Sequence, residues 1–227
     1  MKSSSPLIFE SMLCLLFSYS LRKASFCFFS CSDVSGKILY TTATVVFDNE
    51  TEKSMSKTWF SVFVQTESEA QRGEQLEIST VKSDLTWKIN ELQFIKNGNK
   101  NWVGYSCLLP YENEKIKSGI YKVKYTDSAG NQGESSFLIS YNEKLLESNS
   151  GDIKKYVTNN LTENIALYDK NDNLLYYGKR KSTWKLDSSI KRDYNSAVYM
   201  RKTLSTVSGS LLFLLPKEDF NNKEEKR

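Results

Sequence analysis

The sequence predicts a mainly β protein in which an antiparallel β-sandwich is followed by a small α+β unit. Two observations predict the sandwich. Short runs rich in β-branched and aromatic residues recur along the first two thirds of the chain, and turn-forming residues stand between them. The runs expected to form its strands are 38–47, 59–66, 74–80, 85–96, 101–108, 120–126 and 136–141.

The clearest expected hairpin lies within residues 119–141. Tyr121, Val123 and Tyr125 alternate with lysines, and this period of two places the three side chains on one face of a strand. The segment 127–131 (Asp-Ser-Ala-Gly-Asn) contains residues that tolerate a positive φ, as hairpin loops require. We therefore predict that the two flanking strands pair antiparallel, with these three side chains on a shared face.

This unit, G-x-Y-x-V-x-Y-x-D-x-x-G-N, resembles the last strand pair of immunoglobulin-like and fibronectin-III-like sandwiches in bacterial secreted proteins. The resemblance extends over about residues 36–142. It implies an immunoglobulin-like antiparallel β-sandwich as the first domain, over 31–142. It implies no particular ligand, because such sandwiches host many functions.

An apolar segment precedes the expected sandwich. It has an apolar core at 13–17, and Ser30-Cys31 stands where the sequence becomes polar. This junction resembles the lipobox of bacterial lipoproteins in its relaxed, spirochaete-like form, although Phe28 stands where the stricter pattern has Leu. The resemblance implies that residues 1–30 are a signal peptide, that Cys31 carries a lipid, and that the protein is anchored to a membrane of the cell envelope, periplasmic or surface-exposed.

Two alternatives stay open for this segment. Glu10 precedes the apolar core and Arg22-Lys23 interrupts the stretch, so the segment departs from a regular signal peptide. If residues 1–30 are not a signal peptide, they are either an uncleaved interfacial or anchoring segment or the result of a misassigned start. A transmembrane helix is disfavoured, because a span needs about 20 predominantly apolar residues and few charges.

The amino-acid composition excludes several classes of function. The chain has 31 basic and 27 acidic residues, and removing residues 1–30 leaves a nearly neutral body, which argues against a nucleic-acid partner. Histidine is absent, so mechanisms in which imidazole carries the proton and the usual catalytic zinc ligand sets are excluded. No glycine-rich phosphate loop is present. We expect no cofactor and no metal, and interpret Cys107 as a small buried hydrophobe.

A boundary is expected after the sandwich. The segment 143–164 is rich in Glu, Lys, Asn and Ser, and we interpret it as a linker with one short helix at 152–157. The α+β unit follows at 165–216, and the charged residues 217–227 are interpreted as a disordered tail. A unit of about 55 residues buries too little surface to be stable alone, so we expect it to dock on the sandwich.

Within this unit we expect three elements. Two apolar runs separated by turn residues predict a hairpin at 165–178. The helical spacing of the apolar residues from Ile190 to Leu204 predicts a helix with one apolar face. The run 211–215 is expected to be a short buried strand that Pro216 stops.

Basic residues concentrate in the C-terminal unit. Between 179 and 202 there are eight Lys and Arg against two Asp, and five aromatic residues lie among or beside them. This pattern favours attraction to an anionic partner, such as lipid headgroups, an acidic glycan or an acidic protein face. The alternative is a solvated helix face and loop. The candidate binding residues are Arg180, Lys181, Trp184, Lys185 and Arg192.

These observations favour a non-enzymatic, membrane-anchored envelope lipoprotein that serves as a binding or scaffold module for an unknown protein or glycan. The main alternative is a carboxylate-dependent, histidine-free hydrolase acting on envelope glycans, for which no catalytic residue can be assigned. A third reading is an accessory subunit of an envelope assembly.

Overall fold

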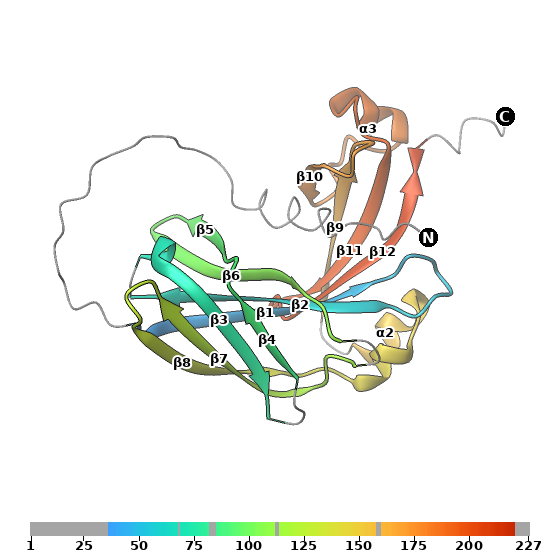
Figure 1. The fold of residues 1–227 in the computed structure, drawn as a ribbon. Helices are drawn as coiled ribbons and strands as arrows, with labels where there is room; N and C mark the ends of the chain where they lie inside the picture. The colour runs from blue at the N-terminus through green and yellow to red at the C-terminus, as the bar shows by residue number, and fades with distance from the viewer. Residues whose placement is uncertain (1–35, 68, 82–84, 112–113, 158–159, 221–227) are drawn as a thin grey trace, which may run out of the picture.

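The computed structural model describes residues 36–67, 69–81, 85–111, 114–157 and 160–220, and these form two β-sheets with a few short helices (Figure 1). The predicted mainly β sandwich is therefore confirmed. The strands are β1 (Ile38–Asp48), β2 (Lys57–Thr66), β3 (Gly73–Thr80), β4 (Thr86–Ile89), β5 (Gln93–Asn97), β6 (Lys100–Leu108), β7 (Gly119–Asp127), β8 (Gln132–Ile139), β9 (Leu161–Tyr168), β10 (Leu174–Gly178), β11 (Tyr199–Thr206) and β12 (Leu211–Asp219). The helices are η1 (Ala70–Arg72), η2 (Glu143–Glu147), η3 (Ser150–Asp152), α2 (Ile153–Tyr156) and α3 (Asp187–Asp193).

The first eight strands have the strand order of an immunoglobulin domain. The larger sheet has the order β10-β9-β11-β12-β1-β2-β6-β5, and the smaller sheet has the order β4-β3-β7-β8. In a constant-type immunoglobulin domain, strands A-B-E-D face strands C-F-G. Here β1-β2-β6-β5 correspond to the first set and β3-β7-β8 to the second, with β4 added beside β3. The predicted run 85–96 forms two strands, because the chain crosses from the smaller to the larger sheet between Ile89 and Gln93.

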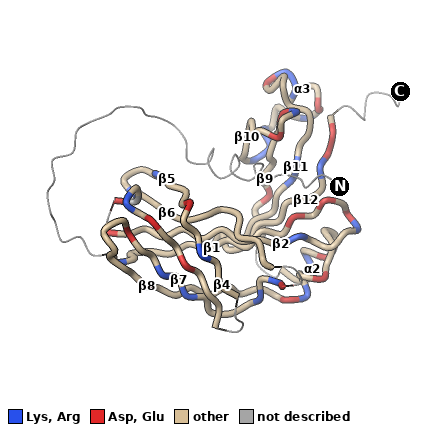
Figure 2. Tube along the Cα trace, viewed as in Figure 1, with Lys and Arg blue, Asp and Glu red and all other residues tan. Residues whose placement is uncertain are grey.

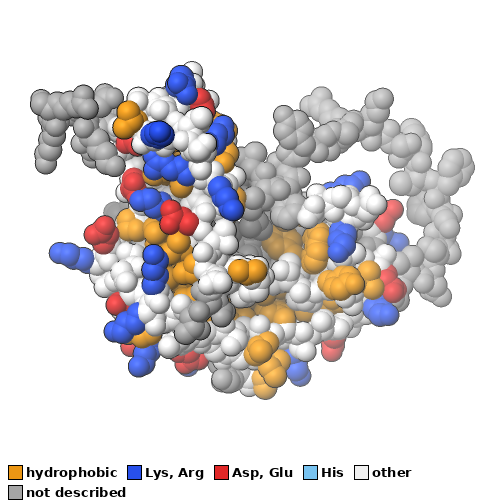
Figure 3. Space-filling model, turned by 180° about the vertical axis from the view of Figure 1, so that it is seen from behind, with side chains coloured by type: hydrophobic (Ala, Val, Ile, Leu, Met, Phe, Trp, Pro, Cys, Tyr) orange, Lys and Arg blue, Asp and Glu red, His pale blue; other side chains and the backbone are white. Residues whose placement is uncertain are grey.

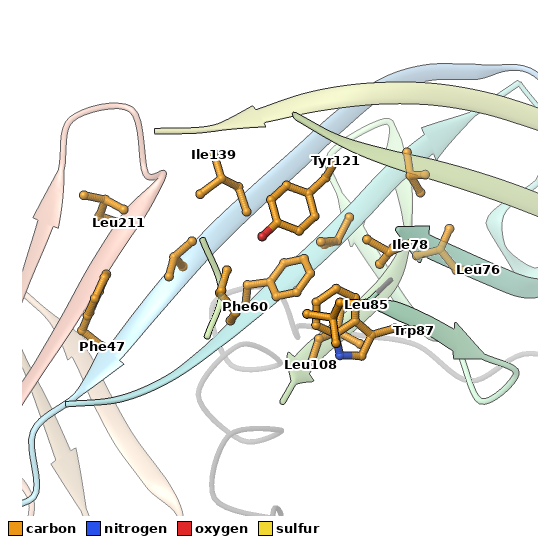
Figure 4. Close-up of a cluster of buried hydrophobic side chains, with 14 of the residues drawn as sticks. Phe47, Phe60, Leu76, Ile78, Leu85, Trp87, Leu108, Tyr121, Ile139 and Leu211 are labelled. Carbon is orange, nitrogen blue, oxygen red and sulfur yellow. The ribbon is translucent and has the colours of Figure 1, made fainter. Parts of the chain in front are cut away.

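Aromatic side chains join the two sheets in the core (Figure 4). The ring of Phe60 on β2 lies 4.7 Å from the ring of Trp87 on β4 and 5.7 Å from that of Tyr121 on β7, measured between centroids. The indole N–H of Trp87 donates to the carbonyl of Leu109 at 2.7 Å, so its polar atom is satisfied in the core. Ring pairs of this kind contribute about 1 kcal/mol each beyond the area they bury.

The predicted hairpin is confirmed. β7 and β8 pair antiparallel, with Tyr121 opposite Phe137. Tyr121, Val123 and Tyr125 are all buried on the face of β7 that meets the larger sheet, and none is more than 1% exposed. The alternation seen in the sequence therefore marks the core face of this strand.

The C-terminal strands extend the larger sheet, so the predicted separate α+β unit is not confirmed. β12 pairs in parallel with β1, and Phe47 lies opposite Phe213. The two rings stack with centroids 5.0 Å apart. β11, β9 and β10 follow by antiparallel pairing and rise away from the smaller sheet (Figure 1). The unit is thus a four-stranded extension of the sandwich that carries one helix, α3.

The segment predicted as a linker, 143–164, packs against the core. Leu145 and Leu146 of η2 and Ile153 of α2 are buried in the same cluster as the sandwich residues. The short helix predicted at 152–157 is present as α2. This segment therefore connects the two regions through apolar contacts in addition to the chain itself.

The helix predicted from Ile190 to Leu204 is wrong beyond its first turns. α3 ends at Asp193, and β11 begins at Tyr199. Both faces of β11 are covered, and most of its residues are buried. A strand buried on both faces lacks the simple alternation of a half-exposed strand, so its apolar residues also fit a helical spacing.

Pro216 does not stop the last strand. β12 continues to Asp219, and its pairing with β11 shifts register at the proline, between Arg201 and Thr203. A register shift of this kind accommodates a residue that has no N–H to donate. The prediction of a disordered tail is wrong for residues 217–220, because β12 runs to Asp219 and Phe220 is buried, and its remainder lies outside the described residues.

Candidate functional site

Residues 179–194 follow β10, include α3 and end five residues before β11 begins. We call this segment the basic cap. The cap lies at the end of the β9–β12 extension farthest from the smaller sheet (Figure 1). Its residues Trp184 and Ile190 are 1% and 0% exposed, and they pack with Ile165 of β9 and Met200 of β11. This apolar contact fixes the cap to the sheet.

Positive charge gathers on the outside of the cap. Several Lys and Arg positions mark the backbone around α3 in Figure 2, and Figure 3 shows Lys and Arg side chains on the arm that α3 and the C-terminal strands form, with Asp and Glu side chains between them. Within the cap, basic residues are opposed only by Asp187 and Asp193. The six basic residues of the cap are Lys179, Arg180, Lys181, Lys185, Lys191 and Arg192.

The remaining two basic residues of the predicted stretch lie outside the cap. Arg201 on β11 is buried, and its guanidinium pairs with the carboxylate of Asp48 on β1. Its Nε also donates to the carbonyl of Leu215 on β12 at 2.7 Å, so this side chain ties three strands together. Lys202 pairs with Glu218 at 2.8 Å. Neither residue adds free positive charge to the candidate surface.

The predicted binding residue Trp184 is part of the core and is only 1% exposed in this structure. Its indole N–H donates to Asp193 Oδ2 at 2.6 Å, and this hydrogen bond is the main cause of the lowered pKa of Asp193. The carbonyl of Trp184 accepts a hydrogen bond from Arg180 Nε at 2.7 Å. Trp184 therefore positions the charged residues around it.

Three aromatic rings surround the ammonium group of Lys181, and we call Tyr176, Trp184 and Tyr194 the aromatic cage. Lys181 Nζ lies 4.5 Å from the ring centroid of Trp184, 5.5 Å from that of Tyr194 and 5.7 Å from that of Tyr176. All three distances are within the range of cation–π attraction. Asp193 Oδ2 lies 3.7 Å from the same nitrogen.

The two remaining predicted residues are on the surface. Lys185 is exposed and is followed by Leu186, an apolar side chain that is 67% exposed. The side chain of Arg192 is 71% exposed, and its Nε lies 3.6 Å from Asp193 Oδ1. The structure thus brings Lys181, Trp184 and Arg192 together around Asp193, joins Arg180 to the carbonyl of Trp184, and places Lys185 next to Trp184 in the chain.

Sequence reasoning did not identify the cage or the role of Asp193. Tyr176 is on β10, whereas Tyr194 follows α3, so only the fold of the cap brings their rings to 5.7 Å. An acidic residue within a basic run is a signal that was available in the sequence. Asp193 accepts from Trp184 and pairs with Lys181 and Arg192, which makes it the polar centre of the cap.

A hollow of about 320 Å³ lies beside the edge strand β5, away from the cap. Phe94 and Lys96 line it from β5, and Glu69 lines it from the loop before η1. Its described lining contains one carboxylate, whereas glycoside hydrolysis commonly uses a pair. Nowhere in the described part of the chain do three or more His, Cys, Asp or Glu side chains gather as a metal site would require.

Cys107 is half-buried and packs against the cluster of apolar side chains that includes Trp59 and Tyr168. Burial raises the pKa of the Cys107 thiol, which disfavours the reactive thiolate.

The predicted lipid-bearing residue, Cys31, and the segment 1–30 lie outside the described residues. Among the described helices, none is long and apolar enough to cross a membrane. No family model, curated protein or solved structure matches this chain.

Proposed function

We propose that this protein is a non-enzymatic binding module of the cell envelope, which engages an anionic protein or glycan through the basic cap. The observation that carries this proposal is the concentration of six basic residues against two acidic ones on a single short segment. A patch of one sign raises the local concentration of an oppositely charged partner and speeds its association.

The cap is fixed before any partner arrives, which favours binding. Its residues Trp184 and Ile190 are buried against the sheet, and α3 ends with a backbone hydrogen bond from Tyr194 to Ile190 at 2.8 Å. Because little of its backbone must be ordered on binding, the entropic cost of association is lower. The exposed Leu186 adds apolar contact area that salt does not screen.

The sandwich serves in this proposal as the spacer, and Cys31 as the membrane anchor. Support for the anchor comes from the apolar segment and the Ser30-Cys31 junction alone. In cells grown with labelled palmitate, the wild-type protein should carry label and partition into detergent. Cys31→Ser should abolish both and leave an unprocessed precursor, and an unchanged mass and partitioning would refute the anchor.

Retention on immobilised heparin tests the cap. Lys179→Glu combined with Lys185→Glu reverses two exposed charges outside the aromatic cage. The matched control combines Lys53→Glu with Lys122→Glu, which makes the same change in net charge at exposed positions of the sandwich. The cap variant should elute at clearly lower salt than the wild type, because exposed charges act over a Debye length of about 8 Å at 0.15 M salt. Equal losses in both variants would show that net charge, and not the cap, determines retention.

The hydrolase alternative receives no support from the described carboxyl groups. A general acid needs a pKa near the working pH, which for a carboxyl group means a raised value. The described carboxyl groups with a clear shift, Glu50, Asp127, Asp169 and Asp193, all have a lowered pKa.

A further inference from the structure

The aromatic cage has walls that are fixed independently of Lys181. The Tyr176 hydroxyl donates to the carbonyl of Lys179 at 2.7 Å, and the Trp184 indole donates to Asp193 at 2.6 Å. Tyr194 is held by its backbone at the end of α3. The ring of Trp184 meets those of Tyr176 and Tyr194 edge-on, at interplanar angles of 74° and 84°. Each of the three rings therefore lies on a different side of the position that Lys181 Nζ occupies.

A cation already occupies that point, and the protein gives its N–H groups little beyond what solvent supplies. The Lys181 side chain is 45% exposed. Asp193 Oδ2 lies 3.7 Å from its ammonium group, longer than a charge-assisted hydrogen bond of about 2.8 Å, and the same oxygen already accepts from Trp184. A primary ammonium is strongly hydrated and has three N–H donors to satisfy. The cage offers it π faces and a distant carboxylate.

A quaternary ammonium group fits these surroundings better. It carries a positive charge and methyl groups but no N–H, so it needs only aromatic faces and a nearby negative charge, which is how such ligands are recognised. We propose that the aromatic cage with Asp193 is a binding site for a trimethylammonium group, and that the Lys181 ammonium is its intramolecular occupant in this structure. A ligand enters by displacing the Lys181 side chain toward solvent.

This inference goes beyond the proposed function and does not depend on it. The cage attracts a cation through its rings and Asp193, whereas the surface of the cap attracts an anion through Lys179, Lys185 and Arg192. The charge reversal at Lys179 and Lys185 should therefore leave trimethylammonium binding in place, even where heparin retention is lost.

The test is a titration of the full-length protein with choline, followed by the indole N–H resonance of Trp184. The wild type should bind choline, and Lys181→Ala should bind it about tenfold more tightly, because the competing occupant is gone. The neutral isostere 3,3-dimethylbutan-1-ol should not shift the resonance. Lys155→Ala, which removes a lysine from a single ring at 5.2 Å, is the matched control and should bind like the wild type.

Removing one wall separates the cage from other effects of Lys181. Adding Tyr194→Leu to Lys181→Ala should weaken choline binding about tenfold, and Tyr194→Phe should restore it. The proposal is overturned if Lys181→Ala binds choline no better than the neutral isostere, or if the wild type does not bind choline, since the cage then serves only to hold Lys181. Phosphocholine and a peptide with trimethylated lysine distinguish a lipid-type headgroup from a protein partner as the source of the group.

Discussion

Two hairpin turns, one in the sandwich and one in the C-terminal extension, are built in the same way. In the β7–β8 turn, Asp127 Oδ1 accepts from the backbone N–H of Asn131 at 2.9 Å, and Oδ2 accepts from its side-chain amide at 3.1 Å. In the β9–β10 turn, Asp169 makes the same two bonds to Asn173, at 2.9 and 3.0 Å. An Asp followed four residues later by Asn thus closes both loops.

The surroundings of the two turns differ. Asp127 is fully buried, and the left-handed position of its turn is taken by Gly130, at φ 82°. In the other turn Asp172 takes that position, at φ 61°, and its carboxylate accepts from the Tyr199 hydroxyl at 2.6 Å. The local sequence determines the shape of each turn, whereas contacts with distant strands determine what the turn stabilises.

The prediction with the largest expected change in unfolding free energy tests whether the sandwich and the C-terminal extension unfold together. Tyr125 and Tyr168 precede the two turns, and both are at most 2% exposed. Replacing either by Ala should lower the free energy of unfolding by about 4 kcal/mol. Because β1 and β12 share a sheet, urea unfolding followed by fluorescence should remain a single transition in both variants. Two transitions would show that the extension is an independent unit, and Tyr111→Ala, at an exposed site, is the control expected to change little.

A second prediction weakens the joint between the regions directly. Arg201→Met leaves the Asp48 carboxylate without its partner, and both side chains are largely buried. Removing one member of such a pair should cost about 3 kcal/mol. Lys202→Met, one residue along the same strand, breaks a more exposed pair with Glu218 and should cost less than about 1 kcal/mol. Similar midpoints for both variants in urea unfolding would contradict a structural role for Arg201.

The sandwich could be predicted from the sequence further than the extension could. Its strands are local patterns with one buried face, and alternation such as that of Tyr121 and Val123 marks that face. The parallel pairing of β1 with β12 joins residues about 165 positions apart, which no local pattern records. The aromatic cage could not be predicted for the same reason. Its rings come from β10 and from both sides of α3, and no local pattern brings them together. The clustering of the basic candidate residues could be predicted from composition, whereas the burial of Trp184 could not.

A third prediction sharpens the contrast between the two aspartates. Burial alone would raise the pKa of Asp127, but hydrogen bonds from Asn131 and Ala129 outweigh it and the pKa is lowered. The stability this gives is present above the unfolded pKa of about 3.9 and is lost as pH falls through the lower folded pKa. Asp127→Ala should cost about 2 kcal/mol at pH 7, because it leaves buried N–H groups without an acceptor. Asp169→Ala should cost less, since solvent can replace its carboxylate. Both variants should lose part of the acid dependence seen in the wild type by urea unfolding at pH 7 and pH 3.

The smallest effect comes from exchanging the left-handed residues. A Cβ added at Gly130 meets nothing within 4 Å, so Gly130→Asp should cost only the left-handed backbone conformation, roughly 1 kcal/mol. Asp172→Gly relieves the same conformation but removes the hydrogen bond to Tyr199, and two terms of about 1 kcal/mol each should nearly cancel. Thermal or urea unfolding should therefore show a lowered midpoint for Gly130→Asp and little change for Asp172→Gly. If Tyr199→Phe, which removes only the hydroxyl, makes Asp172→Gly stabilising in the double variant, the long-range hydrogen bond is what retains an aspartate at this position. If the double variant shows no such gain, the hydrogen bond to Tyr199 is not what retains Asp172, and its ion pair with Lys217 at 3.5 Å or the local backbone is responsible.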